Sequence, residues 1–271
     1  MTTDYFIGVH ARELERLKDQ HEAWKPETQA LWRAAGFGPG QRLADLGSGP
    51  GFTALELAEL VGGSGSVVAL DKASAFLDFL KAEAKRRGVS NIRTLDADVR
   101  TLDSIEGPLD GAFCRFFLAF LVDDLDAVLA TLHRSLKPGG VLAVMEYLNL
   151  RSATSAPPMR GFDAHTEAWI GYYSRNGGDT AVGARLPSCL AAAGFKIKSA
   201  IPVGGMADPS HRWWSWWGRL IADFGDTLAA DGLMTHADLQ HLRHDWTAAS
   251  KQQNSFIHTP TLIQLVAQKT T

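Results

Sequence analysis

Three glycines at alternate positions, placed between a short apolar run and a segment of helical pattern, constrain the fold more than any other feature of the sequence. The segment reads Leu43-Ala-Asp-Leu-Gly-Ser-Gly-Pro-Gly51, and the helical pattern begins at about Phe52. Glycines allow a ligand to approach the backbone closely, and the first turn of a helix has free N–H groups. A strand, a glycine loop and a helix in this order therefore indicate a ligand site at the end of a strand.

Short apolar runs alternate with segments of helical periodicity along most of the chain. The runs typical of strands are 41–46, 66–70, 91–95, 109–114, 141–147, 195–203 and 261–268, and the helical segments between them are 53–61, 73–87, 122–136, 161–176 and 181–193. This alternation predicts an α/β fold: a Rossmann-like, doubly wound, mostly parallel sheet of seven strands with helices on both faces. In such sheets the ligand binds at the carboxyl ends of the strands, so the residues just after each strand are functional candidates.

The sequence shows no repeat, low-complexity stretch or linker, so we expect one domain over residues 1–271. Residues 1–40 would form an N-terminal helical cap, and residues 41–204 the core, with a lid helix within 148–180. Residues 205–260 would form a tryptophan-rich, C-terminal helical insertion, and residues 261–271 the final strand.

Composition excludes several classes of function. The 27 basic and 30 acidic residues give a net charge of −3, whereas proteins that bind nucleic acid usually carry a basic excess. The two cysteines, Cys114 and Cys189, lie far apart in apolar segments, which fits a reducing, cytoplasmic compartment. The first residues lack a signal-peptide pattern, and the apolar runs are too short to span a membrane. We expect no nucleic-acid or membrane partner, and a monomer or a homodimer.

The spacing of the glycines and the acids around them narrow the ligand class. The dinucleotide fingerprint Gly-x-Gly-x-x-Gly has its third glycine at position 52, where this chain has Phe, and the Lys-Ser/Thr of a phosphate loop is missing. Asp45 precedes the loop, Asp71 ends the second strand, and Asp96-Ala-Asp98 ends the third. A carboxylate at such a strand end can accept hydrogen bonds from ribose hydroxyls. These features favour a nucleoside that carries a positive charge over a dinucleotide.

The chain resembles a class I S-adenosylmethionine-dependent methyltransferase. The resemblance lies in the loop 43–51, in Leu70-Asp71, in Asp96-Ala-Asp-Val99, and in Leu132-His-Arg-Ser-Leu-Lys-Pro-Gly-Gly140, all in order within residues ~40–150, and more weakly in Ala192-Ala-Gly-Phe195. Within the family it is most similar to small-molecule enzymes of the ubiquinone-biosynthesis-like and natural-product type.

The resemblance implies a role for each matching residue. S-adenosyl-L-methionine would be the cofactor, with Asp45 orienting the loop and the ammonium group. The other implied contacts are Gly47, Ser48, Gly49 and Gly51 at the methionine part, Asp71 and Lys72 at the ribose, Asp98 and Val99 at the adenine, and Arg115 and Phe116 near the transferred methyl group. An N-terminal segment often closes over the cofactor in this family, so Tyr5, Gln20 and His21 are further candidates.

One departure from related families narrows the acceptor. Enzymes that methylate DNA, glutamine or adenine amino groups carry Asn/Asp-Pro-Pro-Tyr/Phe after the fourth strand, where this chain has Cys114-Arg-Phe-Phe117. The resemblance thus argues against those substrates.

A general base is required only if the acceptor must lose a proton. The candidates are Glu146 and Tyr147, which end the fifth strand, and His165 in the following helical segment. Glu146 could equally serve a structural hydrogen bond, and His165 could be a packing residue. Asp123-Asp124 is read as a helix start, and His236, His241 and His244 as a solvated helix face, so we expect no metal site.

Tryptophan is concentrated outside the motif region. Four of the eight tryptophans lie within Trp213-Trp-Ser-Trp-Trp217. Aromatic side chains commonly line pockets, so the proposed acceptor-binding residues are Trp169, Tyr172, Tyr173, Trp213 and Trp217. The alternatives are core packing and a subunit interface.

The sequence thus predicts methyl transfer from S-adenosylmethionine to a small aromatic or hydrophobic acceptor, on oxygen first and on nitrogen or carbon otherwise. Positioning the nucleophile in line with the methyl carbon and the sulfur can supply up to ~7–11 kcal/mol of the acceleration. The alternatives are an NAD(P)-dependent oxidoreductase, a non-catalytic cofactor-binding module, and methylation of a protein side chain.

Overall fold

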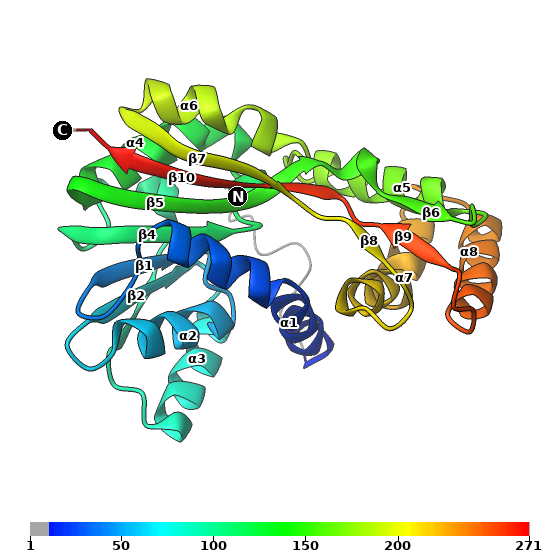
Figure 1. Cartoon of the computed structure of the whole chain (residues 1–271), viewed down its shortest axis with the longest axis horizontal. Coiled ribbons are helices and arrows are strands. Elements are labelled where there is room, and N and C mark those ends of the chain that lie inside the picture. The colour runs from blue at the N-terminus through cyan, green and yellow to red at the C-terminus, as the bar shows by residue number, and fades with distance from the viewer. Residues whose placement is uncertain (1–10, 271) are drawn as a thin grey trace.

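The structure is a computed structural model that describes residues 11–270. Its main sheet has the strand order β3-β2-β1-β4-β5-β10-β7 (Figure 1). The strands are β1 Arg42–Leu46, β2 Ser66–Asp71, β3 Ile92–Asp96, β4 Leu109–Arg115, β5 Leu136–Asn149, β7 Phe195–Val203 and β10 Thr261–Lys269. Strands β1 to β5 pair in parallel, and only β10 runs antiparallel to its neighbours β5 and β7. The predicted seven-stranded Rossmann-like sheet is confirmed.

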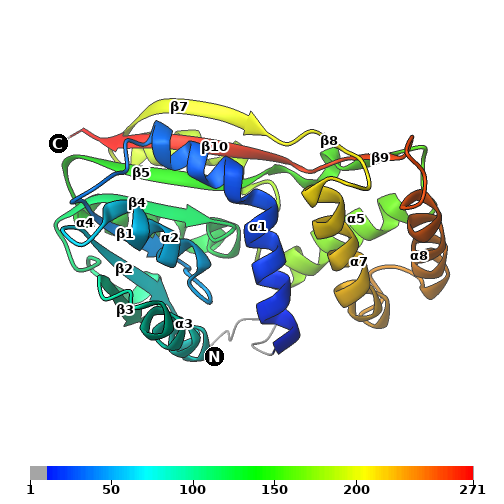
Figure 2. The same cartoon turned by 60° about the horizontal axis from the view of Figure 1, so that its bottom comes forward.

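Helices cover both faces of this sheet. Helix α1 (Ala11–Ala34) and α2 (Phe52–Val61) lie in front of it in Figure 2, while α4 (Leu125–Ser135) and α6 (Leu186–Ala192) pack on the opposite side. Helix α3 (Ser74–Arg87) packs on β2 and β3 and ends at Gly88, a C-cap with a left-handed φ of 69°. The strand order places the carboxyl ends of β1 and β4 side by side. This is the topological switch point, because strands are added on one side of β1 up to β3 and on the other side from β4 onward.

A helical extension continues the molecule beyond the ends of β5 and β10 (Figure 1). It contains α5 (Phe162–Arg175), α7 (Arg212–Ala230) and α8 (His236–Ala249). Helix α5 lies in the segment 148–180, and α7 and α8 lie in the segment 205–260, where a helical insertion was predicted. A small sheet joins β6 (Thr154–Ala156), β9 (Phe256–His258) and β8 (Met206–Ala207) above them. This sheet was not predicted from the sequence, because strands of two or three residues are too short to show an alternation of apolar and polar residues.

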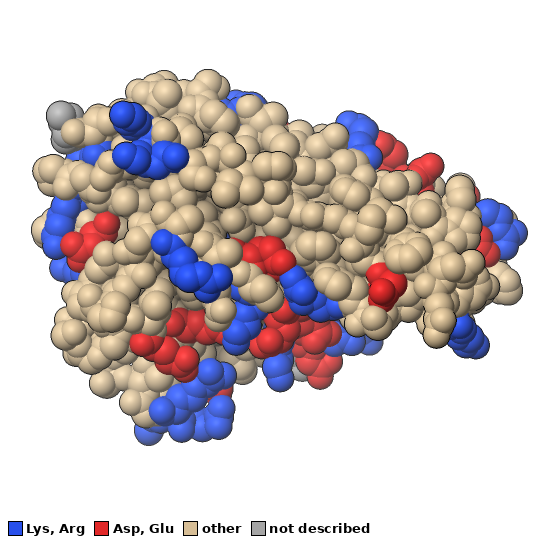
Figure 3. Space-filling model, in the orientation of Figure 1, with Lys and Arg blue, Asp and Glu red and all other residues tan. Residues whose placement is uncertain are grey.

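Helix α1 connects the two parts of the molecule. Its Trp24 is fully buried against Trp213 and Trp216 of α7, with ring centroids 5.0 and 5.2 Å apart. Figure 3 shows acidic and basic side chains intermixed below the middle of the molecule, where the N-terminal part of α1 lies in Figure 1. Among the residues described, no helix is both long and apolar enough to cross a membrane.

Candidate active site

A cavity of about 670 Å³ lies at the carboxyl ends of the parallel strands. Its lining has two parts, which we call its ends: the segments that follow β1, β2 and β3 form the first, and the segment that follows β4, Tyr147 of β5, and α1, α5 and α7 form the second. Its volume falls within the range of about 300–1,000 Å³ that is typical of small-molecule sites. The first end contains the glycine loop and the acids that sequence analysis singled out.

The glycine loop needs glycine for two reasons. Gly47, Gly49 and Gly51 have φ values of 61°, 53° and 82°, which L-residues rarely adopt. A Cβ on Gly47 would lie 2.2 Å from the Phe117 ring. Gly47 and Gly49 line the cavity, whereas Gly51 does not, because it faces Leu80 of α3.

Asp71 and Asp45 lie beneath the loop. The Gly49 N–H donates to Asp71 Oδ2 at 2.7 Å, and the Ala73 N–H donates to Oδ1 at 2.9 Å. Burial raises the pKa of Asp71, against these hydrogen bonds, which act to lower it. Asp45 accepts a 2.6 Å hydrogen bond from the Thr53 hydroxyl, and burial raises its pKa to about 7. Both carboxyl groups line the cavity, and Lys72 lines it beside Asp71.

Asp98 and Val99 line the cavity after β3. Asp98 Oδ1 accepts from the backbone N–H of Arg100 at 3.0 Å and from its Nε at 2.9 Å. The Arg100 guanidinium holds the pKa of Asp98 below its usual range. The carboxylate is therefore fixed and charged at the edge of the cavity, with the buried Val99 side chain next to it.

One polar group in the loop lacks a partner. The Ser48 hydroxyl is buried, lines the cavity, and makes no hydrogen bond to the residues that the structure describes. A buried hydroxyl is nearly always hydrogen-bonded, so a polar ligand is the expected partner. This hydroxyl and the hydrogen-bond-accepting carboxylates of Asp45, Asp71 and Asp98 together fit a ligand that has hydroxyl groups and a positive charge.

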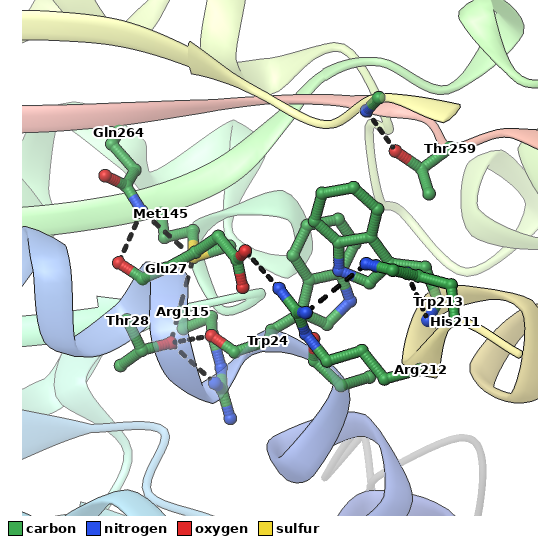
Figure 4. A network of polar contacts seen from close by, with 12 residues as sticks. Trp24, Glu27, Thr28, Arg115, Met145, His211, Arg212, Trp213, Thr259 and Gln264 are labelled. Carbon is green, nitrogen blue, oxygen red and sulfur yellow. Dashed lines mark hydrogen bonds and ion pairs between the residues drawn. The ribbon is translucent and has the colours of Figure 1, made fainter. Parts of the chain in front are cut away.

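Arg115 and Phe116 follow β4 and line the cavity (Figure 4 shows Arg115). Arg115 Nη1 donates to the Thr28 hydroxyl of α1 at 2.8 Å, and burial lowers the pKa of Arg115 to about 10. Phe116 has a φ of 53°, rare for a residue with a side chain, and its ring packs 5.0 Å from that of Tyr147.

Of the three N-terminal residues predicted to lie near the cofactor, only one is placed in the cavity lining by the residues that the structure describes. Gln20 lines the cavity. His21 does not line it, and its Nε2 instead lies 3.1 Å from Glu56 Oε1. Tyr5 lies outside the described residues.

Aromatic rings form the second end of the cavity. Those that line it are Phe116, Phe117, Phe120, Tyr147, Trp169, Tyr173 and Trp217, which we call the aromatic wall. Tyr173 stacks on Phe120 at 5.1 Å and lies 6.1 Å from Tyr147. Of the predicted acceptor residues, Trp169, Tyr173 and Trp217 line the cavity, whereas Tyr172 and Trp213 do not. Trp213 instead packs against α1.

Two of the three predicted base candidates do not reach the cavity. The Glu146 carboxylate accepts backbone hydrogen bonds from Phe117, Leu118 and Ala119 at 2.5, 2.6 and 3.3 Å, and burial raises its pKa to about 7. It holds the turn after β4. His165 is fully buried among α5 and α7, where burial lowers its pKa to about 3. Tyr147 does line the cavity, and burial raises its pKa.

Several residues of the lining were not predicted from the sequence. They include Arg16 and Leu17 of α1, Phe117 and Phe120 after β4, and Leu220 of α7. The two phenylalanines directly follow Arg115 and Phe116, so their position after a strand end was a usable signal. The α1 and α7 residues carry no comparable local signal.

Comparison with known proteins identifies the first end of the cavity. Residues 43–140 match the family described as methyltransferase domain. These residues form a class I S-adenosylmethionine-dependent methyltransferase domain. The family match confirms the resemblance that the glycine loop and the strand-end acids carry.

Relatives and solved structures agree with this domain. The ubiquinone/menaquinone biosynthesis C-methyltransferase UbiE of Shewanella oneidensis is 34% identical over 128 residues, which are 47% of this chain and 49% of that protein. UbiE of Coxiella burnetii is 32% identical over 149 residues, which are 54% and 56% of the two chains. The chain thus spans about half the length of the curated relatives it matches.

The solved structures extend the likeness of fold to nearly the whole chain. A putative methyltransferase of Bacillus halodurans has a TM-score of 0.60 at 16% identity, covering 90% of this chain and 98% of that one. The phosphoethanolamine N-methyltransferase 2 of Haemonchus contortus has a TM-score of 0.59 at 17% identity, covering 92% and 53%. The cyclase SpnF shares the fold at a TM-score of 0.58 and 19% identity, covering 92% and 81%.

Proposed function

We propose that this protein transfers a methyl group from S-adenosylmethionine to a small, flat, largely apolar acceptor. The observation that carries the proposal is one cavity that joins the glycine loop and its carboxylates to the aromatic wall. A cofactor at the first end and an acceptor at the second would then meet near Phe116 and Tyr147, where the two ends adjoin.

The residues of the first end fit the cofactor. Asp71 would accept from the ribose hydroxyls with its remaining lone pairs, and Asp98 and Val99 would hold the adenine. Ser48 and the glycine backbone would contact the methionine part, whose ammonium group is attracted to Asp45. When bound, S-adenosylmethionine supplies a methyl group on a positively charged sulfur, which becomes a neutral thioether once the methyl group is transferred.

The aromatic wall would hold the acceptor and exclude water. Flat rings pack well against Tyr173 and Trp169, because aromatic pairs gain ~0.5–1.5 kcal/mol beyond area burial. Exclusion of water helps a reaction in which positive charge is lost. Oxygen is the proposed acceptor atom, and carbon is the second candidate because the curated relatives are named C-methyltransferases.

The base candidates take new roles in this proposal. Glu146 acts as a positioning residue, because its carboxylate fixes the backbone of Phe117–Ala119 and so the start of the aromatic wall. His165 is a packing residue of the helical extension. Tyr147 remains the one candidate of the three that faces the acceptor, as a hydrogen-bonding group.

Calorimetry with S-adenosylhomocysteine, the demethylated cofactor, tests the cofactor half of the proposal. Asp71→Ala should weaken binding about 100-fold, because a charge-assisted hydrogen-bond acceptor and the anchor of the loop are both lost. The matched control is Asp78→Ala, since Asp78 is exposed on α3 and pairs with Lys81 of the same helix. Unchanged affinity in Asp71→Ala would remove the ribose assignment, and no binding to the unaltered protein would overturn the function.

Transfer itself is tested with methyl-labelled S-adenosylmethionine and a panel of one- to three-ring aromatic acceptors. A product that gains one methyl group supports the proposal, and the NMR shift of that group separates oxygen from carbon. Tight binding of S-adenosylhomocysteine without transfer to any acceptor would favour a cofactor-binding protein of another activity.

A further inference from the structure

A chain of hydrogen-bonded polar side chains runs along α1 and ends at the cavity. Glu13 and Arg16 are 1% and 5% exposed, and the Glu13 carboxylate accepts two 2.7 Å hydrogen bonds from Arg16 Nε and Nη2. Arg16 Nη1 donates to Gln20 Oε1 at 3.0 Å, one helical turn further on. Gln20 lines the cavity, so the last group of the chain, its amide, belongs to the site.

This chain decides which atom of the Gln20 amide faces the cavity. A guanidinium can only donate, so the amide atom that it contacts must be the oxygen. The nitrogen Nε2 has no hydrogen-bond partner among the described residues, and it is not closed off from solvent. A positive charge at the amide oxygen also polarises the group, which makes its N–H bonds better donors. Gln20 thus offers the cavity a hydrogen-bond donor of fixed orientation.

The amide lies where the two ends of the cavity adjoin. On one side is Arg16, whose charge acts to lower the pKa of Tyr147 in the aromatic wall. On the other side the ring of His21 lies 5.8 Å from that of Phe52, which lines the cavity directly after the glycine loop. An acceptor whose reacting atom meets the transferred methyl group would place its neighbouring substituents at this junction.

We propose that the acceptor is a flat ring that carries a carbonyl oxygen, and that the Gln20 amide donates a hydrogen bond to this oxygen. The inference rests on the proposed methyl transfer and names its substrate class. A carbonyl group conjugated with a ring lies in the plane of that ring, so the molecule can pack flat against the aromatic wall and still reach the amide with its edge. A phenol or ether oxygen is a weaker acceptor, because its lone pair is delocalised into the ring.

Arg16 and Glu13 are positioning residues in this proposal. A buried ion pair costs desolvation that its attraction only partly offsets, and apolar residues of similar volume are often as stable. A polar network does fix the geometry of its members, however. Glu13 holds the guanidinium, and the guanidinium turns the amide nitrogen of Gln20, rather than its oxygen, toward the acceptor.

The test compares probes that differ in the carbonyl oxygen alone. Protein saturated with S-adenosylhomocysteine is titrated by calorimetry with acetophenone and ethylbenzene, and with 2-acetylnaphthalene and 2-ethylnaphthalene. The quantity measured is the carbonyl preference, defined as the ratio of the two affinities within a pair. Gln20→Met removes the donor but keeps the length of the side chain. It should lower the carbonyl preference of at least one pair about fivefold, because one hydrogen bond is lost, and leave the affinity for S-adenosylhomocysteine unchanged.

Two further variants separate hydrogen bonding from packing. Gln20→Glu keeps the size of the side chain and an oxygen for Arg16 but replaces the donor by an acceptor, so it should lower the carbonyl preference at least as much as Gln20→Met. Arg16→Lys keeps the charge but loses the planar fork that holds Glu13 and Gln20 together, and should give an intermediate preference. The control is Gln29→Met, because Gln29 lies on the same helix and bonds Glu56 without lining the cavity; its carbonyl preference should stay unchanged.

Four outcomes would overturn the inference. The first two are no measurable binding of either ketone and an unchanged carbonyl preference in Gln20→Met for both pairs. The third is an equal weakening of both members of each pair, which would make Gln20 merely structural. The fourth is weakened binding of S-adenosylhomocysteine in Gln20→Met, which would assign the amide to the cofactor. Each differs from failure of the proposed function, which would show as no binding of S-adenosylhomocysteine to the unaltered protein.

Discussion

The two ends of the cavity are built on different principles. The end at the strand termini is made largely of backbone, namely positive-φ glycines and N–H groups held by the carboxylates of Asp71 and Asp98, all within residues 45–100. The aromatic end is made of side chains from the segment after β4, from Tyr147 of β5 and from α1, α5 and α7, which lie far apart in sequence and meet only when the helices pack on the sheet.

This difference separates what is general from what is specific. Backbone geometry at strand ends can hold the same ligand in many proteins of one fold, because it depends on the sheet and little on side-chain identity. The family match ends at residue 140, before the helical extension begins at α5. Changes at the first end should therefore alter folding of the loop and cofactor binding, and changes at the second end should alter acceptor binding alone.

The largest effect is expected from adding one methyl group to the loop. Gly47→Ala combines a left-handed φ, which costs ~1–2 kcal/mol, with a Cβ placed 2.2 Å from the Phe117 ring, a clash that costs ~1–3 kcal/mol. We expect the free energy of unfolding in urea to fall by about 3 kcal/mol. Gly49→Ala is the matched variant, because its Cβ meets nothing within 4 Å, and it should lose only ~1–2 kcal/mol. Equal losses would contradict the packing of Gly47 on the aromatic wall.

A pair of adjacent tyrosines tests the second end. Tyr173 stacks on Phe120 in the cavity wall, whereas Tyr172 is comparably buried but does not line the cavity. Tyr173→Ala should weaken binding of 2-naphthylmethanol about tenfold, since an aromatic contact is lost, and leave the affinity for S-adenosylhomocysteine unchanged. Tyr172→Ala should leave both affinities unchanged in the same calorimetric titrations. A matching loss of the naphthyl probe in both variants would show a general loosening of α5.

Local patterns predicted the first end because each of its features is encoded within a few residues. The apolar run of β1, the glycines, and Asp71 at the end of β2 each follow from their own neighbours in sequence. The sheet followed because alternating strands and helices permit few topologies.

The second end could not be predicted in detail, for three physical reasons. Strand β5 is buried on both faces, so its pattern did not show that Tyr147 reaches the cavity and Glu146 does not. Trp213 and Trp217 are one helical turn apart, and only the position of α1 decides that Trp213 packs against Trp24. Arg16 depends on that same packing, which no local pattern reports.

The pH dependence of cofactor binding sharpens the role of Asp45. Burial raises its pKa to about 7, while the charge of Arg115 and the Thr53 hydrogen bond act to lower it. Below pH 7 the carboxyl group is neutral and attracts an ammonium group less, so the affinity for S-adenosylhomocysteine should fall about tenfold between pH 7.5 and pH 5.5. Calorimetry at both pH values checks this, and Asp45→Asn should show almost no change. A pH-independent affinity in the unaltered protein would place the ammonium group elsewhere.

The raised pKa of Asp45 affects the stability of the fold in the opposite direction from cofactor binding. Because the folded pKa of Asp45 lies above the usual carboxyl value near 3.8, the folded state binds the proton more tightly than the unfolded state. Its contribution favours folding at low pH and is lost as the pH rises through about 7. Asp45→Asn should therefore be more stable than the unaltered protein at pH 8 without ligand, as measured by urea unfolding.

The smallest effect is expected where α1 docks on α7. Arg219 of α7 lies 3.1 Å from Glu15 and 3.3 Å from Asp19 of α1, and 3.1 Å from Asp223 of its own helix. Glu15 and Asp19 are largely exposed, and exposed pairs contribute only ~0.2–1 kcal/mol each. Arg219→Met should thus lower the free energy of unfolding by less than about 1 kcal/mol at low salt, and by less still near 1 M salt, where such charges are screened. A larger, salt-independent loss would mean that these charges, rather than the buried packing of Trp24 on Trp213, hold the aromatic end closed.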